Sequence, residues 1–263
     1  MGALHEGHLS LIRRSKREND IAIVSIFVNP IQFGPGEDYD RYPRPFHDDV
    51  KLLASLGVDV LFAPQRDQMI LPGNLTRIQV AGLREKLCGS PQFRGPGHFD
   101  GVATIVAKLF HLIRPHKAYF GLKDYQQVRV IEQMVADLNL DVGIVRCPTI
   151  READGVAMSS RNRYLSVEDR GRVSLFFDAL QHGRKLLTSD QEIDGKSVCQ
   201  RIKARLMKIP PSKIDYVSLV DAETLEPVRS MTRPAVLAAA IHIKKTRLID
   251  NIIIDPHEKK VSC

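Results

Sequence analysis

The sequence predicts an α/β protein of two domains: a doubly wound parallel sheet over residues 1–150 and a smaller α+β domain over residues 151–263. Two observations carry this prediction. In the first part, short apolar segments rich in β-branched residues alternate with amphipathic segments of helical spacing. In the second part, two helical segments precede three apolar segments with no crossover helix between them. A chain of 263 residues with 43% hydrophobic composition is long enough to bury two cores.

The first domain is expected to open with a helix over residues 8–17. An eight-residue apolar run over 21–28 follows, and such a run is typical of a parallel strand covered on both faces. A loop over 29–44, dense in Pro, Gly and Asp, leads to an amphipathic helix over 48–56 and a strand over 58–62. Strand, helix, strand is the unit from which parallel sheets are built.

The alternation continues as far as residue 150. Four further elements are predicted: a helix over 102–113, a strand over 118–120, a helix over 124–138 and a strand over 142–147. The third of these has one apolar face, made by Val128, Ile131, Val135 and Leu138. Ligands of doubly wound sheets bind beyond the carboxyl ends of the strands, so we expect the site at loops 29–33 and 121–124.

The second domain is expected to start with Ser166 and Asp169, which resemble a capping box, at the head of a helix running to residue 187. A helix over 195–208 follows. Three strands are predicted over 214–220, 235–243 and 248–254, and without crossover helices they should be antiparallel. The polar tail over 255–263 is expected to fray.

Composition narrows the function classes. The net charge of +7 is spread thinly: residues 1–150 carry 18 Lys and Arg against 16 Asp and Glu, and residues 151–263 carry 20 against 15. Without a basic block interleaved with aromatics, we expect no nucleic-acid partner. No run approaches the roughly 18 apolar residues of a membrane span and no secretory signal opens the chain, so we expect no membrane association and a cytoplasmic location. The four cysteines form no Cys-x-x-Cys pair, which argues against a zinc site or a disulfide framework.

His5-Glu6-Gly7-His8 is the sharpest local feature, because it stands at the predicted start of the first helix. Unpaired backbone amides and the helix dipole attract phosphate there. Two imidazoles three residues apart would face the same anion, and Gly7 lets the backbone approach a nucleotide closely. The alternative explanation is that both histidines are exposed in a loop and have no functional role.

Met158-Ser159-Ser160-Arg161 follows a turn-like Asp154-Gly155 near the predicted domain junction. Hydroxyls and a guanidinium on a mobile loop can close over a triphosphate and stabilise charge on departing pyrophosphate. A solvated polar loop would explain the tetrapeptide alone, but its order after the histidine pair favours the phosphate-binding interpretation.

The segment from Phe120 to Gln127 reads as a strand end that runs into a helix N-terminus. Gly121 permits the turn, Lys123 can meet a phosphate, and Asp124 can cap the helix or accept from a ribose hydroxyl. In the matching loop after the first strand, Gln32 could bind a small polar substrate.

The first two motifs resemble the His-Ile-Gly-His and Lys-Met-Ser-Lys-Ser elements of class I adenylate-forming enzymes and nucleotidyltransferases. Together with the loops at 27–34 and 120–127, in this order and spacing, they resemble the pantothenate synthetase (pantoate–β-alanine ligase) family. The match runs from Met1 to about Ile254. Further segments that support the resemblance are Tyr42-Pro43-Arg44, Pro96-Gly97-His98-Phe99 and Arg151-Glu152-Ala153-Asp154-Gly155.

The resemblance implies a Rossmann-like first domain and a ligase that forms a C–N bond in two steps. Pantoate attacks the α-phosphorus of ATP to give pantoyl-adenylate and pyrophosphate, and β-alanine then displaces AMP. ATP is a substrate, Mg²⁺ accompanies it, and a homodimer is expected. Asp48 and Asp49 are candidates for holding the metal, although adjacent acids at a helix start are ordinarily capping residues.

The resemblance also assigns site residues. His5, His8, Lys123 and Arg161 would be catalytic. The ATP site would be lined by Met1, Gly2, Gly7, His8, Gly121, Leu122, Lys123, Asp124, Ile150, Met158, Ser159, Ser160 and Arg161. Pantoate and β-alanine would meet Asn29, Gln32, Tyr42 and Gln127.

The sequence departs from the family at two places. Family members generally begin with a helix and a strand ahead of the Met-Gly-Ala-Leu-His segment, so we expect this sheet to lack its first strand. Either the true start lies upstream or the product is a catalytically impaired nucleotide-binding remnant. Residues 87–99 also carry about three residues beyond the usual spacing, which leaves the role of Arg94 open. Another nucleotidylyltransferase of the same superfamily is the remaining alternative, although the two glutamines favour a small carboxylate substrate.

Overall fold

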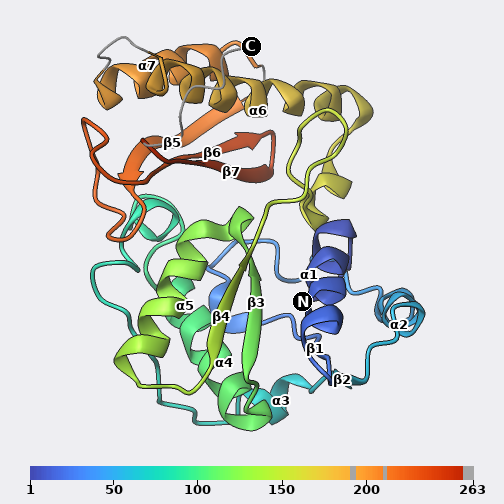
Figure 1. Ribbon diagram of the computed structural model, residues 1–263. Helices are drawn as coiled ribbons and strands as arrows, with labels where there is room; N and C mark the ends of the chain where they lie inside the picture. The colour runs from blue at the N-terminus through green and yellow to red at the C-terminus, as the bar shows by residue number, and fades with distance from the viewer. Residues whose placement is uncertain (190–193, 210–211, 257–263) are drawn as a thin grey trace. The chain divides into compact units, whose positions relative to one another are not determined.

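A computed structural model describes residues 1–189, 194–209 and 212–256 (Figure 1). Its Cα positions divide the chain into two compact units. The first comprises Met1–Glu85 and Gly89–Ile150, and the second comprises Lys86–Cys88 and Arg151–Cys263. Three residues from the middle of the first segment therefore group with the second unit.

The first unit contains two parallel strand–helix–strand arrangements. The strands β1 (Ile23–Ser25) and β2 (Val60–Phe62) are connected through α2 (Phe46–Ser55). The strands β3 (Lys117–Gly121) and β4 (Gly143–Cys147) are connected through α5 (Tyr125–Asp137). The predicted parallel pairing is confirmed, but the strands form two separate two-stranded sheets instead of one doubly wound sheet.

The remaining helices of the first unit lie between and around these strands (Figure 1). They are α1 (Glu6–Glu18), α3 (Arg66–Met69) and α4 (Gly97–Ile113), with 3₁₀ turns at η1 (Pro30–Gln32) and η3 (Leu122–Asp124). A further 3₁₀ turn, η2 (Leu87–Gly89), overlaps the segment that groups with the second unit. The helix α4 begins five residues earlier than the apolar spacing of 102–113 predicts. A helix start is set by the chain that enters it, and periodicity does not report that.

The apolar run over residues 21–28 forms a shorter strand than predicted. Ile21 and Ile23 are 64% and 40% exposed, whereas Ala22 and Val24 are buried. This alternation is typical of a strand covered on one face, so the prediction of burial on both faces was wrong. The hydrogen bonds to β2 end at Ile26, whose backbone N–H donates to the carbonyl of Phe62 at 2.9 Å, and the backbone N–H of Phe27 donates instead to the carbonyl of Met1 at 3.2 Å.

The apolar face of α5 is nearly as predicted. Val128 and Ile131 are completely buried. Leu138 is the exception, since it is 50% exposed. The helix ends at Asp137, and a residue beyond the last helical position no longer follows the 3.6-residue period that placed it on this face.

The second unit consists of helices and an antiparallel sheet. After η4 (Ser160–Tyr164) come α6 (Val167–Leu187) and α7 (Gly195–Leu206). Ser166 caps α6, because its Oγ accepts from the backbone N–H of Asp169 at 3.2 Å, as the capping-box pattern predicts. The strands β5 (Ser212–Asp221), β6 (Ala235–Ile243) and β7 (Thr246–Ile254) pair in the order β5-β6-β7, and the antiparallel prediction is confirmed.

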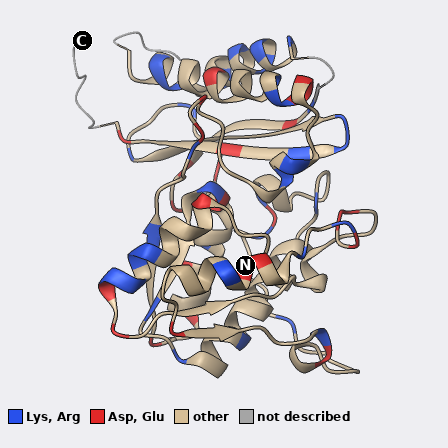
Figure 2. Cartoon of the chain, turned by 90° about the vertical axis from the view of Figure 1, so that its right-hand side faces the viewer, with Lys and Arg blue, Asp and Glu red and all other residues tan. Residues whose placement is uncertain are grey.

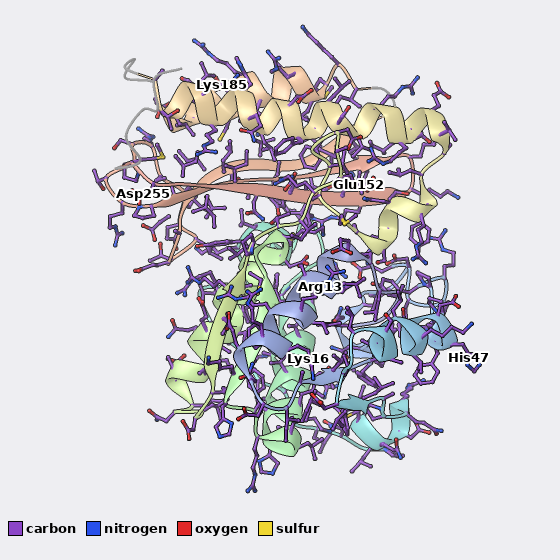
Figure 3. All side chains as sticks on the ribbon, turned by 45° about the vertical axis from the view of Figure 1, so that its right-hand side comes forward. Arg13, Lys16, His47, Glu152, Lys185 and Asp255 are labelled. Atoms are coloured by element: carbon purple, nitrogen blue, oxygen red, sulfur yellow. The ribbon has the colours of Figure 1, made fainter. Side chains whose placement is uncertain are left out.

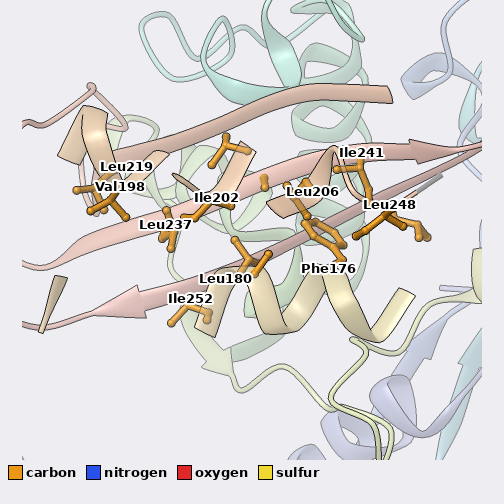
Figure 4. Close-up of a cluster of buried hydrophobic side chains, with 14 of the residues drawn as sticks. Phe176, Leu180, Val198, Ile202, Leu206, Leu219, Leu237, Ile241, Leu248 and Ile252 are labelled. Atoms are coloured by element: carbon orange, nitrogen blue, oxygen red, sulfur yellow. The ribbon is translucent and has the colours of Figure 1, made fainter. Parts of the chain in front are cut away.

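The core of this unit lies between the two helices and the sheet (Figure 4). Phe176 and Leu180 of α6 meet Ile202 of α7 and Leu237 of β6. Gly183 is required by this packing, because a Cβ there would lie 2.4 Å from Ile202 Cδ1. The amphipathic periods read from the sequence therefore face the expected core.

In the view of Figure 2, Lys and Arg alternate with Asp and Glu over both units, without a large block of one sign. Among the described residues, no helix combines the length and apolarity that crossing a membrane requires. Most of the tail predicted to fray lies outside the described residues.

Candidate functional site

The segment before α1 is held by one buried carboxylate. Ala3 has a φ of 50°, in the left-handed region, and both Ala3 and Leu4 are buried. Their backbone N–H groups donate to Asp49 Oδ2 and Oδ1 at 2.8 and 2.7 Å. Asp49 is 2% exposed and lies in the first turn of α2. It therefore fixes the segment that leads into α1.

This geometry gives Asp49 a structural role that the prediction of metal binding by Asp48 and Asp49 did not include. Both oxygens of Asp49 accept buried backbone hydrogen bonds, whereas Asp48 is exposed. Within the described ranges, no group of three or more His, Cys, Asp and Glu is arranged to hold a metal ion. The structure assigns Asp49 to support of the loop, because its lone pairs point at backbone amides and are shielded from solvent.

The two histidines meet at the start of α1. His5 is the N-cap residue, and the backbone N–H groups of His8 and Leu9 donate to its carbonyl at 2.7 and 3.0 Å. The centroids of the His5 and His8 rings are 4.0 Å apart. Gly7 lies between them in the first turn, and its carbonyl accepts from Ser10 Oγ. The three-residue spacing thus places both imidazoles together at a helix N-terminus, as predicted.

The surroundings of His8 are buried and positive. Burial lowers the pKa of His8 to about 2, with further contributions from the neighbouring His5 and Lys123. His8 Nδ1 is buried, and no described residue lies within hydrogen-bonding distance of it. A neutral imidazole next to a lysine leaves a site where a bound anion would supply the missing partner.

The loop between β3 and α5 holds Gly121, Leu122, Lys123 and Asp124. Asp124 stands at the N-cap of α5, but its side chain makes no capping hydrogen bond, so the capping prediction was wrong. Its Oδ1 lies 3.8 Å from Lys123 Nζ, and its side chain is 48% exposed. The Asp124 carboxylate is therefore accessible to a ligand.

The two adjacent glutamines of α5 differ in their environments. Gln126 is buried, and its Nε2 donates to the carbonyl of Leu83 at 2.9 Å, which is a structural role. Gln127 is half-buried, and its side chain makes no hydrogen bond to any described residue. Of the two glutamines, Gln127 is accordingly the one whose side chain is available to a ligand.

Asn29 and Gln32 are joined in the loop after β1. Asn29 is 5% exposed, and its Nδ2 donates to the carbonyl of Gly101 at 3.0 Å and to Gln32 Oε1 at 3.1 Å. Its Oδ1 accepts from the backbone N–H of Ile31 at 3.2 Å. Asn29 therefore supports η1 and holds the Gln32 side chain.

Tyr42 belongs to an aromatic cluster next to η1. The Phe33 ring meets those of Tyr39 and Tyr42 edge-on, with centroids 5.3 and 6.0 Å apart. The Arg44 guanidinium stacks over Tyr39 at 4.8 Å and donates to the carbonyl of Tyr42. Tyr42 is thereby held close to the backbone that carries Gln32.

The Met158–Arg161 segment belongs to the second unit, whereas Ile150 is the last residue of the first. Ser159 caps η4, and its Oγ accepts from the backbone N–H of Arg161 at 3.3 Å. Ser160 is 6% exposed. The tetrapeptide thus forms the entry to a 3₁₀ helix.

Two arginines support the chain just before this segment. Arg151 donates to both oxygens of Asp250 at 2.7 and 2.9 Å. Arg170 pairs with Glu152 and Asp154, each at 2.6 Å, and holds the pKa of Asp154 below its usual value. These ion pairs join the 151–155 turn to α6 and β7.

Sequence reasoning missed two contributors in the first unit. Asp49 anchors the loop before α1, and its partners lie 45 and 46 positions away in sequence. The other is a set of side chains, Glu37, Arg94 and His98, which contact one another and the Gln32 backbone. The only signal for His98 was the phrase Pro96-Gly97-His98-Phe99, which names no partner.

Comparison with known proteins gives one consistent result. A family model described as pantoate-beta-alanine ligase matches residues 1–253. A pantothenate synthetase from Caldicellulosiruptor bescii is 49% identical over 255 residues, covering 97% of this chain and 89% of that protein. One from Thermotoga petrophila is 48% identical over 254 residues, with the same coverages.

Solved structures agree. The crystal structure of pantothenate synthetase from Thermus thermophilus has a TM-score of 0.91 at 45% identity and covers 96% of this chain and 90% of that one. A pantoate-beta-alanine ligase from Francisella tularensis, complexed with beta-gamma ATP and beta-alanine, has a TM-score of 0.77 at 37% identity. The match covers 96% of this chain and 87% of the Francisella one.

The parallel strand–helix–strand units, the histidine pair at a helix start and these similarities define a ligase, an enzyme that forms a carbon–nitrogen bond. The chain belongs to the pantoate–β-alanine ligase family. No comparison favours a nucleotidylyltransferase.

Proposed function

We propose that this chain condenses pantoate with β-alanine at the expense of ATP, through a pantoyl-adenylate. The observation that carries the proposal is the pair of imidazoles 4.0 Å apart at the N-terminus of α1, beside Lys123. Helix N-termini and lysines attract phosphate, and a family member has been crystallised with an ATP species and β-alanine.

The first step would join a pantoate carboxylate oxygen to the α-phosphorus while the bond to pyrophosphate breaks. Charge builds up on the phosphate oxygens, so the protein has only to position the reactants and stabilise that charge. We assign this task to His5, His8 and Lys123. At physiological pH a neutral His8 donates one hydrogen bond, while Lys123 supplies the positive charge.

The second step would form the amide bond. The β-alanine amine attacks the acyl carbon, loses a proton and expels AMP. We propose that Asn29, Gln32, Tyr42 and Gln127 receive pantoate and β-alanine. The hydrogen bond that Asn29 donates to Gln32 supports this, because it leaves the Gln32 amide nitrogen free to donate to a substrate oxygen.

The remaining ATP contacts rest on the family resemblance. We propose that Met1, Gly2 and Gly7 line the nucleotide site with Gly121 and Leu122, that Asp124 binds the ribose, and that the backbone near Ile150 meets adenine. Met158, Ser159, Ser160 and Arg161 would bind phosphates. This arrangement corresponds to a Rossmann-like nucleotide-binding domain over 1–150 and a smaller domain over 151–263.

Mg²⁺ enters this proposal as part of the ATP substrate. A hard dication that bridges phosphates needs few protein ligands, and it neutralises phosphate charge. The described residues contain no cluster that would hold it independently, so no residue is assigned to it. We also retain a homodimer and a cytoplasmic location as proposals.

AMP release tests the function. Chain incubated with ATP, Mg²⁺, pantoate and β-alanine should release AMP, and omission of either pantoate or β-alanine should abolish release. His8→Ala should lower turnover at least ~100-fold, the effect of losing one preorganised donor to a phosphate transition state. His47→Ala is the matched control, because His47 is exposed on α2 and points away from the body of the unit (Figure 3). Near-normal turnover in His8→Ala would contradict the assigned role, and AMP release without pantoate would contradict the reaction.

A further inference from the structure

A closed chain of hydrogen bonds surrounds the backbone at Gln32. His98 Nδ1 lies 2.7 Å from the Gln32 carbonyl oxygen, and His98 Nε2 lies 3.1 Å from Arg94 Nη1. Arg94 in turn donates to Glu37, from Nε to Oε1 at 2.7 Å and from Nη2 to Oε2 at 2.5 Å. Glu37 Oε2 also accepts from the backbone N–H of Gly34 at 3.2 Å. This series of hydrogen bonds therefore begins at the Gln32 carbonyl and ends at the backbone N–H of Gly34, two residues later in the sequence.

The partners fix the tautomer of His98. A carbonyl oxygen can only accept, so His98 Nδ1 must carry the proton. A guanidinium can only donate, so His98 Nε2 must be unprotonated and accept from Arg94. Burial and the positive charge of Arg94 lower the pKa of His98 to about 3, which agrees with a neutral ring. Arg94 thus sets the hydrogen-bonding state of the group that holds Gln32.

The ion pair between Arg94 and Glu37 is well shielded from solvent. The side chains of Arg94 and Glu37 are 13% and 23% exposed. Burial tends to raise the pKa of Glu37, but the bonds from Arg94 outweigh it and keep that pKa below its usual value. Two parallel N–H···O bonds in such a setting are stronger and more directional than a surface pair.

The Gln32 side chain is oriented from the other side. Asn29 Oδ1 accepts from a backbone N–H and Asn29 Nδ2 donates to the carbonyl of Gly101, which fixes the orientation of the Asn29 amide. The contact from Asn29 Nδ2 to Gln32 therefore requires the Gln32 oxygen. Gln32 Nε2 is left as a donor without an acceptor among the described residues, which suits a carboxylate or hydroxyl oxygen.

We propose that Arg94 is a positioning residue for pantoate, which acts through His98 and Glu37 to hold Gln32 where its amide nitrogen donates to a pantoate oxygen. This inference rests on the proposed function and deepens it. Arg94 itself contacts no reacting atom. Its loss should loosen the η1 backbone and weaken pantoate capture more than ATP capture, because the hydrogen bonds of Arg94 and His98 lead to Glu37 and to the Gln32 backbone.

The test is pantoate-dependent exchange of pyrophosphate into ATP by wild type, Arg94→Gln and Arg84→Gln. Arg84 is a matched control: it is 18% exposed in the same unit and pairs with Glu85 and Asp100, but it does not contact His98 or Gln32. In Arg94→Gln the KM for pantoate should rise about tenfold or more, as expected when a substrate-binding group loses its support. The KM for ATP should change less than twofold, and Arg84→Gln should leave both KM values near wild type.

Glu37→Gln interrupts the same series of hydrogen bonds at a second point. It should also raise the KM for pantoate. Arg94→Lys keeps the charge without the forked geometry and should fall between wild type and Arg94→Gln. Two results would overturn the positioning role: equal rises in the KM values for pantoate and ATP, or no rise in the KM for pantoate in either Arg94→Gln or Glu37→Gln. In both cases, pyrophosphate exchange by the wild type would still support the proposed function. Absence of exchange in wild type would overturn the function and this inference together.

Discussion

Asp49 illustrates what a single side chain does in this protein. Its position beside Asp48 at a helix start predicted capping or metal binding, yet it accepts from the backbone of Ala3 and Leu4. Ala3 adopts a left-handed backbone, which a non-glycine residue keeps only when its surroundings enforce it. The anchored segment ends at His5, so Asp49 indirectly orients the histidine pair.

Replacement of Asp49 separates the structural role from metal binding. Asp49→Ala removes the acceptor of two buried N–H groups and should lower the free energy of unfolding by about 2–4 kcal/mol. Asp49→Asn, which keeps one acceptor, should cost less. The Mg²⁺ concentration that supports half-maximal AMP release should not change in either variant.

Asp48→Ala is the control, because the Asp48 carboxylate is exposed and its removal should be nearly neutral for stability. Chemical denaturation monitored by circular dichroism supplies the unfolding free energies. A several-fold higher Mg²⁺ requirement in Asp49→Ala, with stability unchanged, would restore the metal-binding interpretation.

The proximity of the two histidines could be predicted from the sequence, whereas the protonation state of His8 could not. A three-residue spacing at a helix start is local, and it places two rings on one side whatever the rest of the chain does. Burial in the folded chain lowers the pKa of His8, and Lys123, which contributes to the same shift, is more than 100 positions away.

At the scale of elements, the contact between α4 and η1 is the tightest that concerns the proposed substrate loop. A Cβ at Gly101 would lie 2.3 Å from the carbonyl oxygen of Ile31. Backbone cannot yield as a side-chain tip can, so only glycine fits. The same glycine offers its carbonyl to Asn29, and the contact therefore also sets the distance between α4 and the Gln32 loop.

Gly101→Ala should consequently destabilise the protein by about 1–3 kcal/mol, the usual cost of overpacking. It should also raise the KM for pantoate, because η1 must move. Gly97→Ala in the same helix is the matched control: a Cβ at that position would meet nothing within 4 Å, and the substitution should be neutral or stabilise by up to about 1 kcal/mol. Thermal unfolding and initial rates would report both effects, and equal behaviour of the two variants would refute the packing argument.

The strand β1 was predicted less accurately than most longer elements, whereas β6 has the predicted bounds of 235–243. Amphipathic spacing located α1, α2, α5, α6 and α7 to within a few residues, because the 3.6-residue period is repeated several times in each. The strands β1 and β2 are three residues long, and their apolar runs are longer than the paired segments. Strand pairing ends where the neighbouring strand turns away, and the composition of a segment does not reveal where that happens.

For the whole molecule, the pairing of carboxylates with arginines predicts acid sensitivity. Arg94 outweighs burial at Glu37, and Arg170 acts on Asp154, so both carboxyl pKa values lie below their usual 4.5 and 3.8. A carboxyl whose pKa is lower in the folded state stabilises the fold above its unfolded pKa, and this contribution is lost as pH falls through the folded value.

The melting temperature should therefore fall steeply below about pH 4.5. Glu37→Gln should be less stable than wild type at pH 6, and the difference should shrink towards pH 3, where Glu37 of the wild type becomes protonated. Thermal unfolding between pH 3 and 7 measures both trends. A difference between the two proteins that stays constant across this range would show that Glu37 does not titrate as proposed.

The sequence by itself determined the order of the helices and strands, the antiparallel sheet of the second unit and the local motifs that resemble one enzyme family. These depend on near neighbours and on repeated periods. The tertiary structure decided that the first-unit strands form two separate pairs, that Asp49 supports a loop, and that Arg94 and His98 reach Gln32. Those outcomes come from contacts between residues 26 to 66 positions apart, whose burial and hydrogen bonds exist only once the chain has folded.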